Sequence, residues 1–102
     1  MDVFISLFTD QDNNTVLNTV GDNLADIEQM IEHSIINEDI KHDAGARYEV
    51  EKFDVPDVIT IDLGDDGEPL KIPNTGHNLI ERYTVLYSNG KTADFSIYRK
   101  RF

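Results

Sequence analysis

The sequence predicts a small α+β domain, in which an antiparallel sheet of about five to six strands packs against one main helix at residues 22–38. Short apolar segments with period-two alternation lie on both sides of a single segment that has helical periodicity. A chain of 102 residues has the usual length of one domain, and 39% hydrophobic residues suffice for one core. We therefore expect residues 1–102 to form a single acidic domain.

The N-terminal half is expected to contain a strand and then the helix. Residues 3–8 are apolar at both alternating positions, which is typical of a strand covered on both faces. Residues 15–20 are rich in β-branched side chains and form either the second arm of a hairpin or a loop into the helix. Asp22 or Asn23 can cap the helix. Four apolar residues then recur at a spacing of three or four, as one helical stripe: Leu24, Ile27, Ile31 and Ile35.

The C-terminal half is expected to consist of strands at residues 47–53, 58–63, 69–72, 82–88 and 91–98. The last two flank Asn89-Gly90, a pair that favours a two-residue type I′ turn. Such a turn would place Ser88 opposite Lys91 and Leu86 opposite Ala93. The predicted core face of this hairpin then consists of Leu86, Ala93, Phe95 and Ile97.

The same register places three tyrosines, Tyr83, Tyr87 and Tyr98, on the opposite and mostly polar face. Tyrosine is amphipathic and suits a protein interface. We expect these residues to contact a partner if the face is open. The alternative is that a neighbouring element, such as the helix, covers them.

The net charge of -11 is unevenly distributed along the chain. Residues 1–40 hold nine acids and no Lys or Arg, whereas residues 81–102 hold two acids and five bases. A field this negative disfavours direct binding to nucleic acid and attracts basic protein surfaces. The basic tail at Arg99, Lys100 and Arg101 is expected either to fray or to pair with nearby acids. The functional alternative is a basic end that points away from the acidic face or docks on a second copy.

The sequence lacks the residues that several kinds of metal-binding and catalytic site require. The chain has no Cys for a disulfide, a thiolate zinc site or a cysteine nucleophile. Asp10-x-Asp12-x-Asn14 begins like a calcium loop, but Thr15 stands where the loop needs Gly and Gly21 where it needs Glu. The three histidines lack metal-ligand spacing, and no nucleotide or hydrolase motif occurs. We expect no metal, no cofactor and no enzymatic activity. With no apolar segment long enough to span a membrane and no convincing signal peptide, we expect a cytoplasmic protein.

The acids themselves are the strongest functional signal. Like charges at i,i+4 on a helix cost about 0.2–0.5 kcal/mol per pair, and no base offsets them between Asp22 and Glu38. Their spacing, about 6 Å along a helix axis, is of the order of the spacing of phosphates along a nucleic-acid strand. The predicted partner-binding carboxylates are two helix pairs, Asp22 with Asp26 and Glu28 with Glu32, supported by Asp10, Asp12, Glu49 and Glu51.

In composition and size, the chain resembles the small acidic proteins of phages and mobile elements that inhibit nucleic-acid-guided defence or restriction systems. The likeness covers composition and size only. The first hypothesis is therefore an inhibitor that occupies the nucleic-acid-binding surface of a basic partner or nuclease, as a DNA mimic of the anti-CRISPR type. The first alternative is a structural module that forms a homodimer through its tyrosine-bearing C-terminal hairpin. The second is a small metal-dependent hydrolase.

Overall fold

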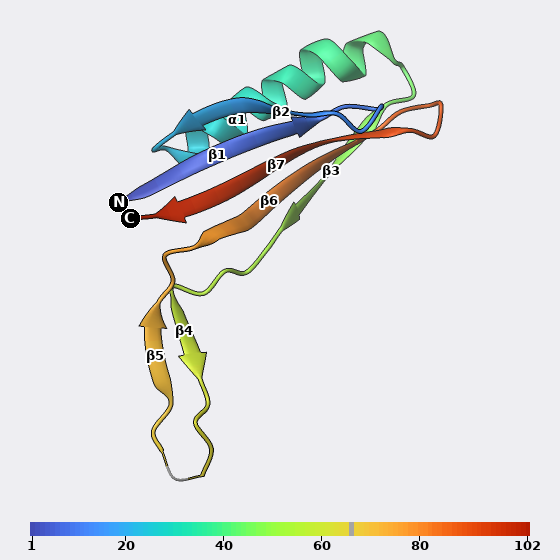
Figure 1. Cartoon of the computed structure of the whole chain (residues 1–102). Coiled ribbons are helices and arrows are strands. Elements are labelled where there is room, and N and C mark those ends of the chain that lie inside the picture. Colours follow the sequence, from blue (N-terminus) through green and yellow to red (C-terminus); the bar gives the residue numbers. More distant parts are fainter. Residues whose placement is uncertain (66) are drawn as a thin grey trace.

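A computed structural model shows one five-stranded antiparallel sheet, a helix across one face of it, and a separate two-stranded arm (Figure 1). It describes residues 1–65 and 67–102, and for residues 39 and 40 only the backbone. The strand order of the main sheet is β2-β1-β7-β6-β3. The elements are β1 (Asp2–Thr9), β2 (Thr15–Gly21), α1 (Leu24–Ser34), the π-helical segment η1 (Ile35–Ile40), β3 (Arg47–Lys52), β4 (Val58–Ile61), β5 (Leu70–Pro73), β6 (His77–Leu86) and β7 (Thr92–Arg101). The predicted α+β fold with one main helix is confirmed.

The first two strands form a hairpin, which settles the alternative left open for residues 15–20. The turn is held by Asp10, whose carboxylate accepts the backbone N–H groups of Asp12 and Asn14, both at 2.9 Å. These hydrogen bonds are the main reason that the pKa of Asp10 is lowered. Asp10 therefore stabilises a polar turn.

Helix α1 begins after Asn23, whose side chain accepts the backbone N–H of Asp26 at 3.3 Å. Asp22 precedes this cap, so its predicted place on the helix, one turn before Asp26, is wrong. Beyond Ser34 the helix continues as η1, where wider π-type spacing leaves carbonyl groups without their α-helical partners. The side-chain amide of Asn37 donates to one of them, the carbonyl of His33, at 2.9 Å.

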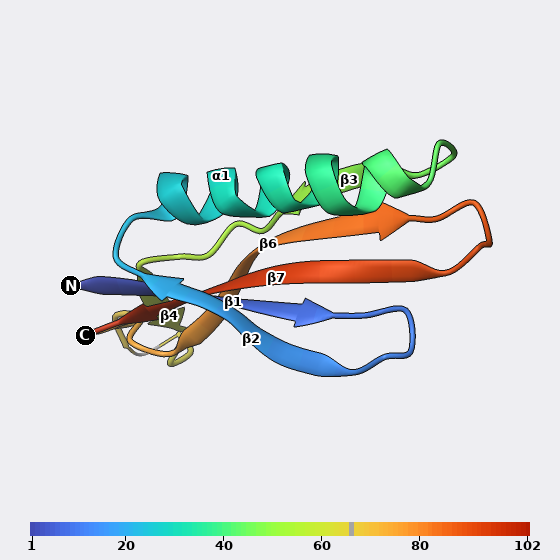
Figure 2. The ribbon, with the colours of Figure 1, turned by 90° about the horizontal axis from the view of Figure 1, so that it is seen from above.

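The core lies between α1 and the central strands β6 and β7 (Figure 2). From the helix it takes Ile27, Ile31 and Ile35, each at most 2% exposed. From the strands it takes Tyr83, Val85, Phe95 and Ile97, and Phe8 packs its ring 4.7 Å from that of Phe95. The predicted apolar stripe of the helix is thus confirmed.

The predicted register of the last hairpin is wrong by one residue. Leu86 pairs with Thr92, and Val85 pairs with Ala93. The loop has three residues, 88–90, and Gly90 takes a positive φ of 83°, a conformation that glycine adopts without strain. Asp43 helps to hold this loop, because its carboxylate accepts both the N–H and the hydroxyl of Ser88. The observed register aligns Tyr83 and Val85 with the apolar residues of β7 on the helix side.

The predicted tyrosine face is wrong for the same reason. Tyr83 is 1% exposed and belongs to the core, and Tyr87 packs against that core on the same side of the sheet. Tyr98 pairs with Ile5 and Leu79 on the opposite side. Because Tyr83 is buried beneath α1 and Tyr98 lies on the opposite side of the sheet, the three tyrosines do not share the open face that their predicted partner contacts required.

Strands β4 and β5 form the arm, which we define as residues 57–73. The arm extends from the end of the sheet near both termini and gives the molecule a long axis of 60 Å (Figure 1). Its base is fixed by Asn74, which is only 6% exposed. The side-chain amide of Asn74 donates to the carbonyl of Pro56 at 2.9 Å, and its backbone N–H donates to the carbonyl of Asp57. Arg99 and Arg101 both pair with the Asp57 carboxylate.

Replacing Ile31 with alanine should lower the free energy of unfolding by about 2–5 kcal/mol, because the side chain is fully buried and its loss leaves a cavity. Met30→Ala is the matched control on the same helix. Met30 is 53% exposed, so this change should alter stability by no more than about 0.5 kcal/mol. Urea denaturation followed by circular dichroism measures both. Equal effects of the two substitutions would contradict the assigned packing face of α1.

Candidate functional site

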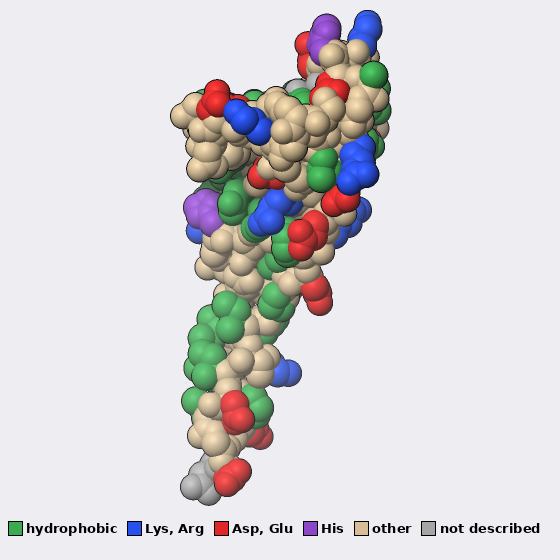
Figure 3. Space-filling view, turned by 90° about the vertical axis from the view of Figure 1, so that its right-hand side faces the viewer, with side chains coloured by type: hydrophobic (Ala, Val, Ile, Leu, Met, Phe, Trp, Pro, Cys, Tyr) green, Lys and Arg blue, Asp and Glu red, His purple; other side chains and the backbone are tan. Residues whose placement is uncertain are grey.

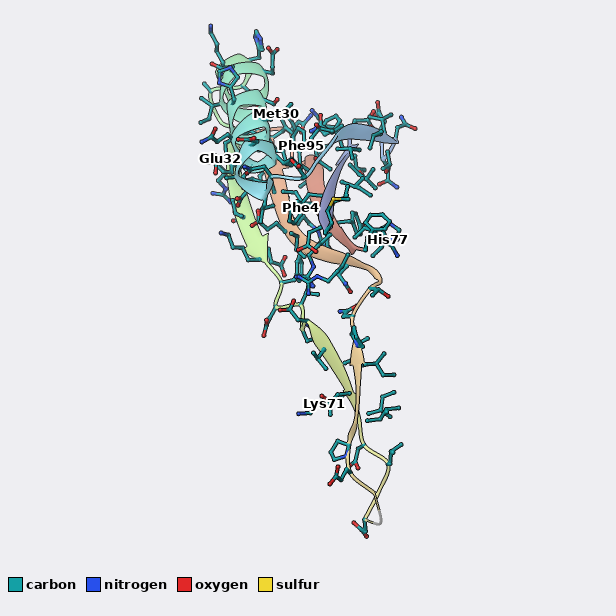
Figure 4. The ribbon with its side chains drawn as sticks, turned by 90° about the vertical axis from the view of Figure 1, so that its left-hand side faces the viewer. Phe4, Met30, Glu32, Lys71, His77 and Phe95 are labelled. Carbon is teal, nitrogen blue, oxygen red and sulfur yellow. The ribbon has the colours of Figure 1, made fainter. Side chains whose placement is uncertain are left out.

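The side of α1 that faces away from the core carries exposed carboxylates. Asp22, Asp26 and Glu32 are exposed, and none of them forms an ion pair within the part of the chain that the structure describes. Figure 4 shows Glu32 on the flank of α1 away from Phe95 and the core. Asp26 lies in the first turn, where the positive end of the helix dipole stabilises its charge. We define the acidic surface of α1 as Asp22, Asp26, Glu28 and Glu32.

The acidic surface of α1 covers two flanks of the helix. Asp26 and Glu28 are two residues apart, so their side chains point to nearly opposite sides of the helix axis. Glu28 is on the flank over β3, where its carboxylate lies 3.9 Å from the ammonium of Lys52. Glu32 follows Glu28 by one turn on that side. The two predicted pairs therefore flank the helix rather than form a single row.

The four supporting carboxylates lie on other elements. Glu49 and Glu51 are exposed on the side of β3 away from the helix, and Glu51 lies 4.0 Å from Arg82. Asp10 and Asp12 lie at the β1–β2 turn, where they line an open cavity of about 500 Å³ together with Lys91. Figure 3 shows acidic and basic side chains interspersed over one side of the main sheet, with further acids along the arm. The structure therefore does not bring the eight predicted carboxylates together.

Sequence reasoning missed Glu81, the carboxyl group whose pKa is shifted most among the described residues. This residue is 5% exposed, on the helix side of β6 and in phase with Tyr83. Burial and the nearby carboxyl of Glu28 raise the pKa of Glu81 to about 7, while Lys52, 3.8 Å away, opposes the shift. Burial and the same carboxylates also raise the pKa of Tyr83. The sequence places Glu81 on the same strand face as Tyr83 and Val85. Because those two residues were not predicted to be in the core, the burial of Glu81 could not be predicted either.

Glu81 and Arg99 line an open cavity of about 360 Å³ between the start of α1 and the segment after β3. A carboxyl group that titrates near neutrality beside a lysine has the pKa of a general acid. However, the Oε2 atom of Glu81 is shielded from solvent and has no hydrogen-bond partner among the described residues. The Nε and Nη2 atoms of Arg99 are shielded in the same way. A substrate in the cavity could not touch these atoms without a rearrangement of the side chains.

The described residues contain no group of three or more His, Asp or Glu side chains placed to hold a metal ion. Within the same part of the chain, none of the helical segments is long and apolar enough to cross a bilayer. No family model, curated protein or solved structure matches the chain. Its function is therefore argued from its own residues.

Glu81 should make the stability of the protein depend on pH between about 5 and 8. Its pKa is raised from 4.5 to about 7, so the folded state binds more protons than the unfolded state in that interval. The stabilisation is complete below pH 4.5 and is lost as pH rises through 7. Glu81→Gln, which mimics the protonated group, should flatten this dependence and raise stability at pH 8 by on the order of 1–3 kcal/mol.

The measurement is urea denaturation of wild type and variant at several pH values. Glu51→Gln is the control, because it removes an exposed carboxylate and should leave the pH dependence unchanged. Stability of the wild type that increases from pH 5 to pH 8 would show that Glu81 is ionised throughout this interval.

Proposed function

We propose that this chain is a non-enzymatic protein that uses the acidic surface of α1 to bind a basic, nucleic-acid-handling partner and to block its phosphate-binding surface. The observation that carries the proposal is the unpaired charge of that surface. Asp22, Asp26 and Glu32 form no ion pair within the described residues, whereas Arg82, Arg99 and Arg101 all form ion pairs elsewhere. Such a partner would place the protein's action in the cytoplasm.

The rigidity of α1 supports the proposal. Three buried isoleucines fix the helix on the sheet, and the Asn23 cap fixes its first turn, so the carboxylates are held in place before binding. Glu28 and Glu32 are about 6 Å apart along the axis, a spacing of the order found between phosphates. The free energy of such binding would be mostly electrostatic, with fast association and strong dependence on salt.

Contacts inside the protein leave fewer carboxylates available for the proposed partner than the eight that the sequence suggested. Asp22, Asp26 and Glu32 carry most of the expected contact, since Glu28 is partly engaged with Lys52 and Glu81. Asp10 is occupied by its own turn, and Glu51 by Arg82. Asp12 lies at the β1–β2 turn, and Glu49 lies on the side of β3 that faces away from the helix. A single partner surface that covers α1 would not contact both residues.

The double variant D26N/E32Q removes two carboxylates from α1 and should weaken partner binding roughly tenfold, because each exposed charge pair contributes about 0.2–1 kcal/mol. The matched control, E49Q/E51Q, removes two exposed carboxylates from the side of β3 that faces away from the helix and should bind like wild type. Basic proteins captured from a nuclease-treated host lysate would be eluted with increasing salt. Each captured protein would then be loaded with a labelled oligonucleotide, and its release on addition of this chain would be measured.

The expected result is salt-sensitive capture by wild type and control, with displacement of the oligonucleotide. Capture that is independent of salt, or equal for all three proteins, would overturn the electrostatic role of α1. Capture without displacement would retain a binding role and reject the inhibitor.

A further inference from the structure

The arm has one apolar face that none of the described residues covers. Strand pairing places Ile59 opposite Ile72 and Ile61 opposite Leu70, so these four side chains share one face. Each is 40–46% exposed. We call these four residues the apolar stripe. A two-stranded hairpin is marginally stable in water by itself, so the arm needs another surface to pack against.

The apolar stripe cannot reach the main sheet of its own chain. Asn74 binds Pro56 across the base of the arm, and Arg99 and Arg101 hold Asp57. These contacts direct the arm away from the sheet, as Figure 1 shows. The surface that covers the stripe must therefore come from another molecule.

The charges along the arm indicate which molecule this is. Exposed acids occur toward the tip, at Asp62, Asp65 and Glu68. The base lies beside the basic end of β7, where Lys100 donates to the carbonyl of Thr75 at 2.7 Å and forms no ion pair within the described residues. Each arm is therefore acidic at its tip, and the ammonium group of Lys100 beside its base has no carboxylate partner within the described residues.

The stripe and this cation face the same side. His77 is the cross-strand partner of Lys100, so both side chains lie on one face of the sheet. Figure 4 shows Lys71 on one side of the arm and His77 toward the other, and Figure 3 shows hydrophobic side chains gathered along the edge of the arm opposite its basic side chain. The pairing of Lys71 with Thr60 agrees, because that pair alternates with the stripe along the hairpin.

We propose that two copies of this chain form a twofold dimer in which their arms pack antiparallel, apolar stripe against apolar stripe. The antiparallel arrangement brings the acidic tip of each arm to Lys100 and His77 of the other copy. The contact is self-complementary, as a twofold interface requires, and it closes after two copies. It buries apolar side chains at its centre and matches opposite charges at its ends. This interface differs from the one expected at the tyrosine-bearing hairpin, and it is independent of the acidic surface of α1.

The first test is the molar mass in solution, measured by light scattering and sedimentation equilibrium over a range of concentrations. Wild type should be a dimer that dissociates on dilution. The variant I61T/L70T has β-branched residues, which suit a strand, at both positions but makes the stripe polar, and it should be a monomer with an unchanged circular dichroism spectrum. The matched control, T60S/K71Q, alters the opposite face of the same hairpin and should remain a dimer.

The second test exchanges the charges at the ends of the interface. Lys100→Glu should weaken the dimer about tenfold, and so should D62K/D65K. The combined variant K100E/D62K/D65K restores opposite charges and should recover the dimer, which a merely structural role of Lys100 would not produce. A monomer at every concentration, a dimer that survives I61T/L70T, or the absence of recovery in the combined variant would each overturn the proposal.

Discussion

The packing of one helix against the two central strands is the interaction on which the rest of this structure depends. Ile27, Ile31 and Ile35 bury their side chains against the β6–β7 hairpin, and this contact is the only substantial apolar core in the described residues. Within the described residues, no second helix covers the other side of the sheet. Half-buried residues such as Ile5 and Tyr98 therefore remain on the uncovered face. The apolar residues of the arm likewise remain exposed.

This packing also explains the unusual environment of Glu81. The register that places Tyr83 and Val85 beneath α1 places Glu81 on the same face, because side chains on a strand alternate with a period of two. The carboxyl group is then buried at the margin of the core beside Glu28. Lys52, on the neighbouring strand, supplies the nearest cation to both groups. An acidic chain folded around one helix thus brings two carboxyl groups together at the border of its core.

The two proposed interaction surfaces lie on different parts of the molecule and depend on different physics. The acidic surface of α1 is rigid, and within the described residues only its Glu28 has a basic partner, Lys52, so the surface favours fast, salt-sensitive association with a basic protein. The apolar stripe of the arm is uncharged and favours burial against a similar surface. Because the two surfaces do not overlap, one copy could use both at the same time. A dimer would present two acidic helices to its partners.

The sequence by itself was sufficient to predict most of the secondary structure. Hydrophobic periodicity placed the helix, whose three buried isoleucines follow the predicted spacing, and alternation located every strand to within a few residues. The alternation of Ile59 and Ile61 with polar residues predicted a strand there, but not that its apolar face would be exposed. These features are local, and local patterns in the chain encode them.

Only the tertiary structure decided which strand faces meet the helix. Asn89-Gly90 favours a two-residue turn, but packing of Tyr83 and Val85 beneath α1 and the hydrogen bonds of Asp43 to Ser88 stabilise a three-residue loop. That shift of one residue places Tyr83 in the core and Glu81 on the same buried face of β6, while Tyr98 stays on the opposite face of the sheet. The alternation of side chains along a strand is local, whereas the choice of the face that is buried depends on contacts between residues far apart in the sequence.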